Sequence, residues 1–283
     1  MNNGYAAAFH ALMCSDPVEK IARVRALAQG WSADDGVDGS APPAEAVPVP
    51  GRPLRPELVA PRALKSRGLG SAAGRAAMVH AVAHIEFNAI NLAVDAVYRF
   101  RGMPADYYRD WLSVAVDEAR HFELLTARLA DLGHAYGDFP AHNGLWEAAC
   151  KTADSCLQRM ALVPRVLEAR GLDVTPAMIE RLRFVGDDAT VEILQVILRE
   201  EVAHVEAGTR WFRYCCAQQG VEPESTFLDL VRMYSSTFIR RPFNESARVS
   251  AGFSELERLG LEQIADVVEP PEQTRTDTAI RSG

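Results

Sequence analysis

The sequence predicts an all-α protein built around a bundle of four long helices. Three observations support this. Several long stretches contain almost no Pro or Gly. Within them, apolar residues recur about every 3.6 residues, as on one face of a helix. No stretch alternates apolar and polar residues as a half-buried strand would. The chain of 283 residues, with 48% apolar and 24% charged residues, can also bury a sizeable core.

The first 63 residues predict a helical segment followed by a linker. Residues 1–31 form an amphipathic helical segment, interrupted near Ser15–Pro17, where a second helix could begin because Pro suits the first helical position. Residues 32–63 are rich in Pro, Gly and acidic residues. Repeated Pro fixes the backbone and removes hydrogen-bond donors, so this segment is expected to be a linker or an extended strap.

Residues 64–220 contain the four predicted bundle helices, at 71–101, 104–132, 145–170 and 188–219. Gly133, Gly171 and Gly220 each follow the end of a predicted helix, which is their usual position. A short helix over 176–185 is expected to continue the third one. Residues 221–268 predict a helical C-terminal extension, and 269–283 read as a disordered tail.

Composition and charge exclude several classes of protein. The net charge of −8 argues against a broad nucleic-acid-binding surface, which needs clustered Lys and Arg. Five cysteines, an odd number without a Cys-x-x-Cys motif, do not form a disulfide framework. No secretory signal and no uninterrupted apolar run of the length of a membrane span are found. These features predict a cytoplasmic protein with no membrane partner.

Two similar motifs carry the chemistry. Residues 117–121 read DEARH and residues 200–204 read EEVAH. In each motif a Glu and a His three residues apart, Glu118 with His121 and Glu201 with His204, share one helical face. The residues one and two turns away on that face are apolar, so these acids are expected in the core. A buried carboxylate is costly unless it is paired or bound to a metal, and no Lys or Arg on these faces is placed to pair with it.

Two further acids extend the pattern to the other two helices. Glu86 lies in the first bundle helix and Glu168 in the third, 82 residues apart, whereas 83 residues separate Glu118 from Glu201. Four carboxylates would balance two divalent cations. The sequence therefore predicts a dinuclear metal site with the following ligands: Glu86, Glu118, His121, Glu168, Glu201 and His204.

Four other acids are candidates for the same site. Asp117 and Glu200 directly precede a ligand Glu and could each accept the free N–H of a ligand imidazole. Glu168 lies only three residues before Gly171, close to the predicted end of its helix. Glu192 or Glu180 is therefore kept as a substitute ligand.

These residues resemble the ferritin-like di-iron carboxylate superfamily. Within it, the stretches VPRVLEARGLDVTP and RRPFNESARVSAGF are similar to an uncharacterised ferritin-like family of bacteria, over roughly residues 65 to 255. The resemblance implies a ferritin-like four-helix bundle with additional N- and C-terminal helices, and the six metal ligands given above. PFNESAR at Pro242–Arg248 is expected to be a turn and helix cap, or to present Asn244 or Arg248 to a substrate.

The function expected from the site is that of a di-iron oxidoreductase of the oxygenase or oxidase type. It would hold two Fe ions, with Mn or mixed Fe/Mn as alternatives, and use O₂ or peroxide to oxidise or hydroxylate a small molecule with electrons from an unidentified donor. Three alternatives stay open. They are an iron-handling ferroxidase, storage or manganese catalase-like protein, a tRNA-modifying hydroxylase, and a non-enzymatic helical interaction module stabilised by metal.

Overall fold

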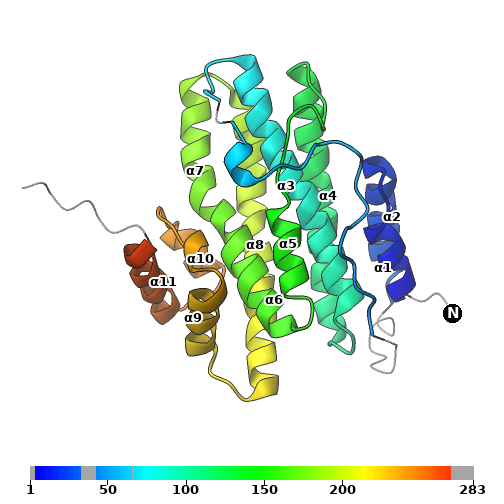
Figure 1. Ribbon diagram of the computed structural model, residues 1–283, viewed down its shortest axis with the longest axis vertical. Coiled ribbons are helices and arrows are strands. Elements are labelled where there is room, and N and C mark those ends of the chain that lie inside the picture. Colours follow the sequence, from blue (N-terminus) through cyan, green and yellow to red (C-terminus); the bar gives the residue numbers. More distant parts are fainter. Residues whose placement is uncertain (1–3, 33–42, 66, 269–283) are drawn as a thin grey trace, which may run out of the picture.

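The described residues are helical and irregular. The computed structural model describes residues 4–32, 43–65 and 67–268 (Figure 1). No strand occurs among them, and their β-type pairing is a single bridge between Leu58 and Ala141. The all-helical fold class predicted from the sequence is confirmed. The predicted tail at 269–283 and residues 33–42 of the predicted linker lie outside the described residues.

Four long helical columns form a bundle. They are α3 (Ala72–Arg99), α4 (Ala105–Asp131), α8 (Asp188–Gln219) and a composite third column. The third column joins α6 (Cys156–Leu162), the π-helical turn η2 (Val163–Glu168) and α7 (Ala169–Phe184). α3 packs along α4, α4 along α8, and α8 along all three parts of the third column. On the remaining side, α5 (Gly144–Lys151) contacts both α3 and η2.

The prediction for the third bundle helix was wrong. The sequence indicated a helix over 145–170 that ends before Gly171, followed by a separate short helix over 176–185. Instead, a break follows α5, and the long column runs from Cys156 to Phe184, with Gly171 and Pro176 inside α7. Glu168 therefore lies near the middle of the column rather than near its end.

A contact from far along the chain explains how α7 continues through Pro176. Pro has no N–H, so the carbonyl of Leu172, four residues earlier, loses its usual helical donor. The side-chain amide of Asn244 supplies one, because its Nδ2 donates to Leu172 O at 3.1 Å. Asp173, the next residue, accepts from the backbone N–H of Asn244 at 2.9 Å and from the guanidinium of Arg248 at 2.9 and 2.6 Å. The PFNESAR segment thus stabilises α7.

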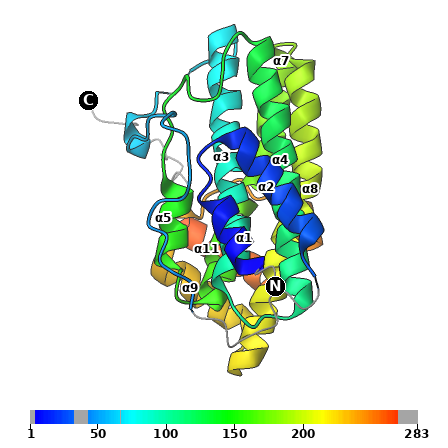
Figure 2. The same cartoon turned by 90° about the vertical axis from the view of Figure 1, so that its right-hand side faces the viewer.

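Further helices cover two sides of the bundle. α1 (Gly4–Leu12) packs on α3 and α2 (Pro17–Gly30) packs on α4 (Figure 2). The side chain of Asp16 caps α2 by accepting from Glu19 N at 2.8 Å. The C-terminal elements pack mainly against the third column, α8 and one another. They are α9 (Pro223–Tyr234), η3 (Ser236–Phe238), α10 (Glu245–Ser250) and α11 (Glu255–Val268), and η1 (Pro61–Ala63) lies in the strap.

α3 is the one described helix whose length and composition would allow it to cross a membrane. Most of its apolar window, 72%, is buried inside the bundle. The apolar composition of α3 is therefore accounted for by its position as a core helix.

Candidate metal centre

The apolar stripes of three bundle helices carry charged side chains into the core. Glu118 and His121 lie on α4, on the face that also buries Trp111, Val114 and Leu125. Glu118 is 1% exposed and His121 is fully buried. On α3, Glu86 begins a run of buried residues that extends to Tyr98, and it is 4% exposed. Burial of so many ionisable groups at one level of the bundle requires that they compensate one another or bind an ion.

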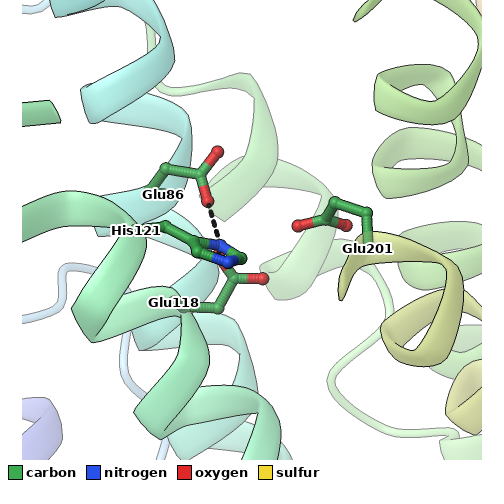
Figure 3. Close-up of side chains that lie close together, drawn as sticks. All are labelled: Glu86, Glu118, His121 and Glu201. Atoms are coloured by element: carbon green, nitrogen blue, oxygen red, sulfur yellow. Dashed lines mark hydrogen bonds and ion pairs between the residues drawn. The ribbon is translucent and has the colours of Figure 1, made fainter. Parts of the chain in front are cut away.

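Four of the predicted ligands meet at one point (Figure 3). Glu86, Glu118, His121 and Glu201 each offer one ligand atom, and these atoms all lie within 4.8 Å of one another. His121 Nδ1 lies 3.2 Å from Glu86 Oε2 and 3.5 Å from Glu118 Oε2. This buried Glu/His cluster could hold a metal ion.

The remaining two predicted ligands border this group. His204 Nδ1 lies 3.0 Å from Glu118 Oε1 and 3.4 Å from Glu201 Oε1. No contact of Glu168 falls within hydrogen-bond distance of the cluster. The charges of Glu201 and Glu118 nevertheless help to raise the pKa of its carboxyl. By contrast, the substitutes considered from the sequence, Glu180 and Glu192, are exposed.

The π-helical turn places Glu168 in the core column. A π turn inserts an extra residue into a helix and so changes the face on which the following side chains lie. Here the N–H of Ala169 donates to Pro164 O, five residues earlier. The turn packs closely on α8, since a Cβ added to Gly208 would lie 2.5 Å from Cβ of Pro164. Only a residue without a side chain allows this approach one turn beyond His204.

Asp117 and Glu200 contact the histidines of the opposite helix. His121 Nε2 lies 2.7 Å from Glu200 Oε2, and His204 Nε2 lies 3.5 Å from Asp117 Oδ2. In both imidazoles the Nδ1 atom faces the buried carboxylates and the Nε2 atom faces one of these acids. With the proton on Nε2, each Nδ1 is left as a lone-pair donor to a cation.

Arg120 joins the two acids and was missed by the sequence-based prediction. Its Nη2 atom donates to Asp117 Oδ1 at 3.2 Å and also to Glu200 Oε2. The position of Arg120, inside DEARH and three residues after Asp117, was the available signal. An ion pair at that spacing is common on helix surfaces, so the signal was weak without knowledge of how α4 faces α8.

Without a metal, protons compensate the cluster. Burial lowers the pKa of His121, but Glu118 and Glu86 outweigh it and raise that pKa to about 11. Burial also raises the pKa of Glu168 to about 8, and the charges of Glu201 and Glu118 add to it. The pKa of Glu86 is held well above its usual range by burial and by Glu118. Binding of cations here would therefore release protons.

Several buried atoms at this site make no hydrogen bond. They are Glu118 Oε2, Glu168 Oε2 and His204 Nδ1, although Glu118 Oε2 lies 3.5 Å from His121 Nδ1 and His204 Nδ1 lies 3.0 Å from Glu118 Oε1. A buried polar atom without a partner costs about 1–3 kcal/mol, and more when it is charged. All three belong to predicted ligands, and all are oxygen or imidazole donors of the kind that Fe and Mn bind. The residues present thus fit a metal site.

Other polar residues of α3 have structural partners. His80 Nε2 accepts from Gly137 N at 2.9 Å, and His84 Nδ1 lies 2.9 Å from the hydroxyl of Tyr136. His84 Nε2 lies 3.2 Å from His142 O. These two histidines therefore attach the loop after α4 to the bundle and do not face the cluster.

The chain belongs to the family described as "Protein of unknown function (DUF455)", whose model matches residues 13–258. It is also similar to an "Uncharacterized protein" of Haemophilus influenzae, with 44% identity over 212 residues. That match covers 72% of this chain and 74% of the relative. No solved structure matches.

Proposed function

We propose that this member of the DUF455 family is a ferritin-like, non-haem dinuclear metal protein that activates O₂ to oxidise or hydroxylate a small molecule. The observation that carries the proposal is the buried group of ligand atoms from Glu86, Glu118, His121 and Glu201, which all lie within 4.8 Å of one another in the bundle core. One Glu from each of two helices and Glu-x-x-His from each of the other two is the ligand set of di-iron carboxylate proteins.

The ligand types favour iron, with manganese as the alternative. Carboxylate and imidazole ligands without sulfur suit Fe or Mn better than Cu(I). Two ferrous ions, when bound, would supply the electrons that O₂ activation requires. An external donor is then needed to return the centre to its reduced state.

The chain itself holds and shields the ions. Glu86, Glu118, Glu168 and Glu201 would provide the negative charge that two divalent ions balance. Glu200 and Asp117 orient the imidazoles of His121 and His204 through their Nε2 atoms. Because the cluster is buried, bulk water is kept away from the reacting ions, which strengthens the electrostatic interactions inside the site.

Metal analysis of ligand variants tests the proposal. The protein is loaded anaerobically with Fe(II), and about two ions per chain are expected. Glu118→Ala with Glu201→Ala should abolish this binding. The matched control is Glu123→Ala with Glu206→Ala, which removes partly exposed acids from the same two helices. About two metals per chain in the ligand variant, or none in the wild-type protein, would contradict the proposal.

Activity measurements separate the proposal from its rivals. O₂ consumption by the reduced iron protein supports an oxygenase or oxidase. Peroxide turnover by the manganese-loaded protein without O₂ uptake supports a catalase, and accumulation of iron far beyond two ions per chain supports storage. A melting temperature that falls on chelation, in a protein that consumes no O₂, supports a helical module stabilised by metal.

A further inference from the structure

A cavity of about 590 Å³ lies where α3 and the third column do not pack directly against each other. Residues of α3, of the turn from η2 into α7, and of the start of α5 form its walls, and Ala63, Leu64, Lys65 and Arg67 also line it. The volume falls within the range of about 300–1,000 Å³ typical of small-molecule sites.

The cavity shares parts of its wall with the turns that carry two predicted ligands. Ile85 and Leu167 line it, and each directly precedes a predicted ligand, Glu86 and Glu168 respectively. The wall is therefore made by the same two turns of backbone that carry these acids. A molecule in the cavity would approach the cluster from the side of the bundle that α5 partly covers.

Apolar side chains dominate the walls, and some of them are unusually exposed. Ile85 is 45% exposed and Phe238 is 57% exposed, and both line the cavity. Large exposed apolar side chains that converge on one hollow are typical of a ligand site. The walls thus suit the apolar body of a ligand.

The charged side chains of the cavity all have one sign. Lys65, Arg67 and Arg170 line it, and no described residue that lines it is acidic, although the chain carries a net charge of −8. Lys65 and Arg67 are exposed, so they lie toward the solvent, and the guanidinium of Arg67 lies over the ring of Phe139 at 5.1 Å. Arg170 is held by the backbone carbonyls of Arg240 and Pro242, at 2.7 and 3.0 Å.

We propose that this cavity binds the organic substrate of the metal centre, and that the substrate is an organic acid with an apolar body and an anionic head. The apolar walls next to Glu86 and Glu168 take the body, and Lys65 and Arg67 attract the head at the mouth. The role as substrate rests on the function proposed above. Binding of such an anion does not require the metal.

Calorimetric titration of the metal-free protein tests the binding. Octanoate, octanol and octylamine share one apolar chain and differ in charge. At low ionic strength, where exposed charges are least screened, octanoate should bind at least about tenfold more tightly than either other probe. Lys65→Glu with Arg67→Glu should remove this preference and leave octanol binding unchanged. Arg109→Glu with Lys151→Glu, the matched charge reversal outside the cavity lining, should change neither.

Two outcomes would overturn the binding inference. One is equal affinity for octanoate and octanol. The other is unchanged binding in Ala81→Trp, because Ala81 is an exposed residue of α3 that lines the cavity and a Trp there should fill it. Since the position is exposed, this variant should fold.

The placement beside the metal is tested by nuclear relaxation of bound octanoate. The protons of octanoate should relax faster with the Mn(II)-loaded protein than with the Zn(II)-loaded protein, and Ala81→Trp should remove the difference. Equal relaxation with both metals would overturn the placement. Failure of the protein to load any metal would instead remove the proposed function, while the calorimetry still decides whether the cavity binds an anion.

Discussion

His121 and Glu200 lie on facing helices, with the Nε2 atom of His121 only 2.7 Å from Glu200 Oε2. His204 and Asp117 repeat this relationship in the opposite direction at 3.5 Å. The first acid of each motif therefore contacts the histidine of the other motif. These two reciprocal contacts make the orientation of both imidazoles depend on the packing of α4 on α8.

The contact between Glu200 and His121 predicts that Glu200→Gln weakens metal binding without removing a ligand. An acid that orients a ligand imidazole typically contributes about 10–100-fold to metal affinity, so a loss of that order is expected. Asp117→Asn should have a smaller effect because its contact with His204 is longer. Competition with a chelator measures both. Glu206→Gln, on the same helix as Glu200, is the control, and unchanged affinity in Glu200→Gln would contradict the assigned role.

Glu168 is predicted to be a ligand whose carboxyl destabilises the metal-free protein at alkaline pH. Burial raises its pKa to about 8 in the folded state, above its ordinary value of 4.5. The folded protein therefore binds the proton of this carboxyl more tightly than the unfolded chain does. The free energy of unfolding that this proton contributes is fully present below pH 4.5 and is lost as the pH rises through 8. Glu168→Gln should remove this loss, and at about pH 8.5, just above that folded-state pKa, the metal-free variant should unfold at a higher urea concentration than the wild type.

The same variant should bind less metal, because an amide is a weaker ligand than a carboxylate. Glu180→Gln is the matched control, since Glu180 is exposed and pairs with Arg183 at 2.5 Å. If Glu180→Gln lost metal and Glu168→Gln kept the full amount, the ligand would have been assigned to the wrong acid.

Gly208→Ala should destabilise the protein by about 1–3 kcal/mol, because its Cβ would overlap Pro164 of the π-helical turn. Gly171→Ala is the control, since Gly171 lies in α7 and a Cβ added there would meet no atom within 4 Å. Replacing this helical Gly should stabilise the protein by about 0.5–1 kcal/mol. Urea unfolding measures both. Equal effects at the two positions would show that α8 and η2 do not require their close approach.

The bundle could be predicted because its determinants are local. Long segments without Pro or Gly and with helical apolar spacing correspond to α3, α4 and α8, whose bounds agree with the predicted ones within a few residues. The proximity of Glu118 and His121 was also predictable, because a Glu and a His three residues apart must share a helical face, and these two lie together with Glu86 and Glu201.

The third column could not be predicted because its determinant is not local. Pro176 ends a helix in isolation, whereas here Asn244, far along the chain, donates to the carbonyl that Pro176 leaves without its helical donor. The pairing of Asp117 and Glu200 with opposite histidines likewise depends on how α4 and α8 face each other. Neither contact produces a pattern of residue spacing that could be recognised in the sequence.

A buried ion pair joins the C-terminal extension to the third column. Arg165 of η2 is fully buried, and its Nη2 lies 2.7 Å from Glu257 Oε2 of α11. Its guanidinium also lies over the rings of Phe212, Phe227 and Phe253, at 4.9, 4.0 and 4.6 Å.

Glu257→Gln should therefore cost about 3–5 kcal/mol, because it leaves the charge of Arg165 buried and unpaired. The double variant Arg165→Met with Glu257→Leu should be less destabilised than Glu257→Gln, since it removes both charges and keeps the volume. Urea denaturation compares the two. A double variant at least as unstable as the single one would indicate that the rings around Arg165 matter more than its pairing with Glu257.

His80 is predicted to make the protein less stable below neutral pH. Burial lowers its pKa to about 4, against the opposing effect of Asp138, because the folded state keeps the ring neutral with Nε2 accepting from Gly137 N. The unfolded chain binds a proton near the ordinary His pKa of 6.5. The stability contributed by the neutral ring is therefore fully present above pH 6.5 and falls as the pH drops toward 4, by about 2 kcal/mol at pH 5.

His80→Gln, which cannot titrate, should lose correspondingly less stability than the wild type between about pH 7.5 and pH 5 in urea unfolding. His134→Gln is the control, because His134 is partly exposed and pairs with Asp138 at 3.4 Å. If His80→Gln and the wild type lost the same stability over this interval, the contact of the neutral His80 ring with the loop after α4 would not be sensitive to acid.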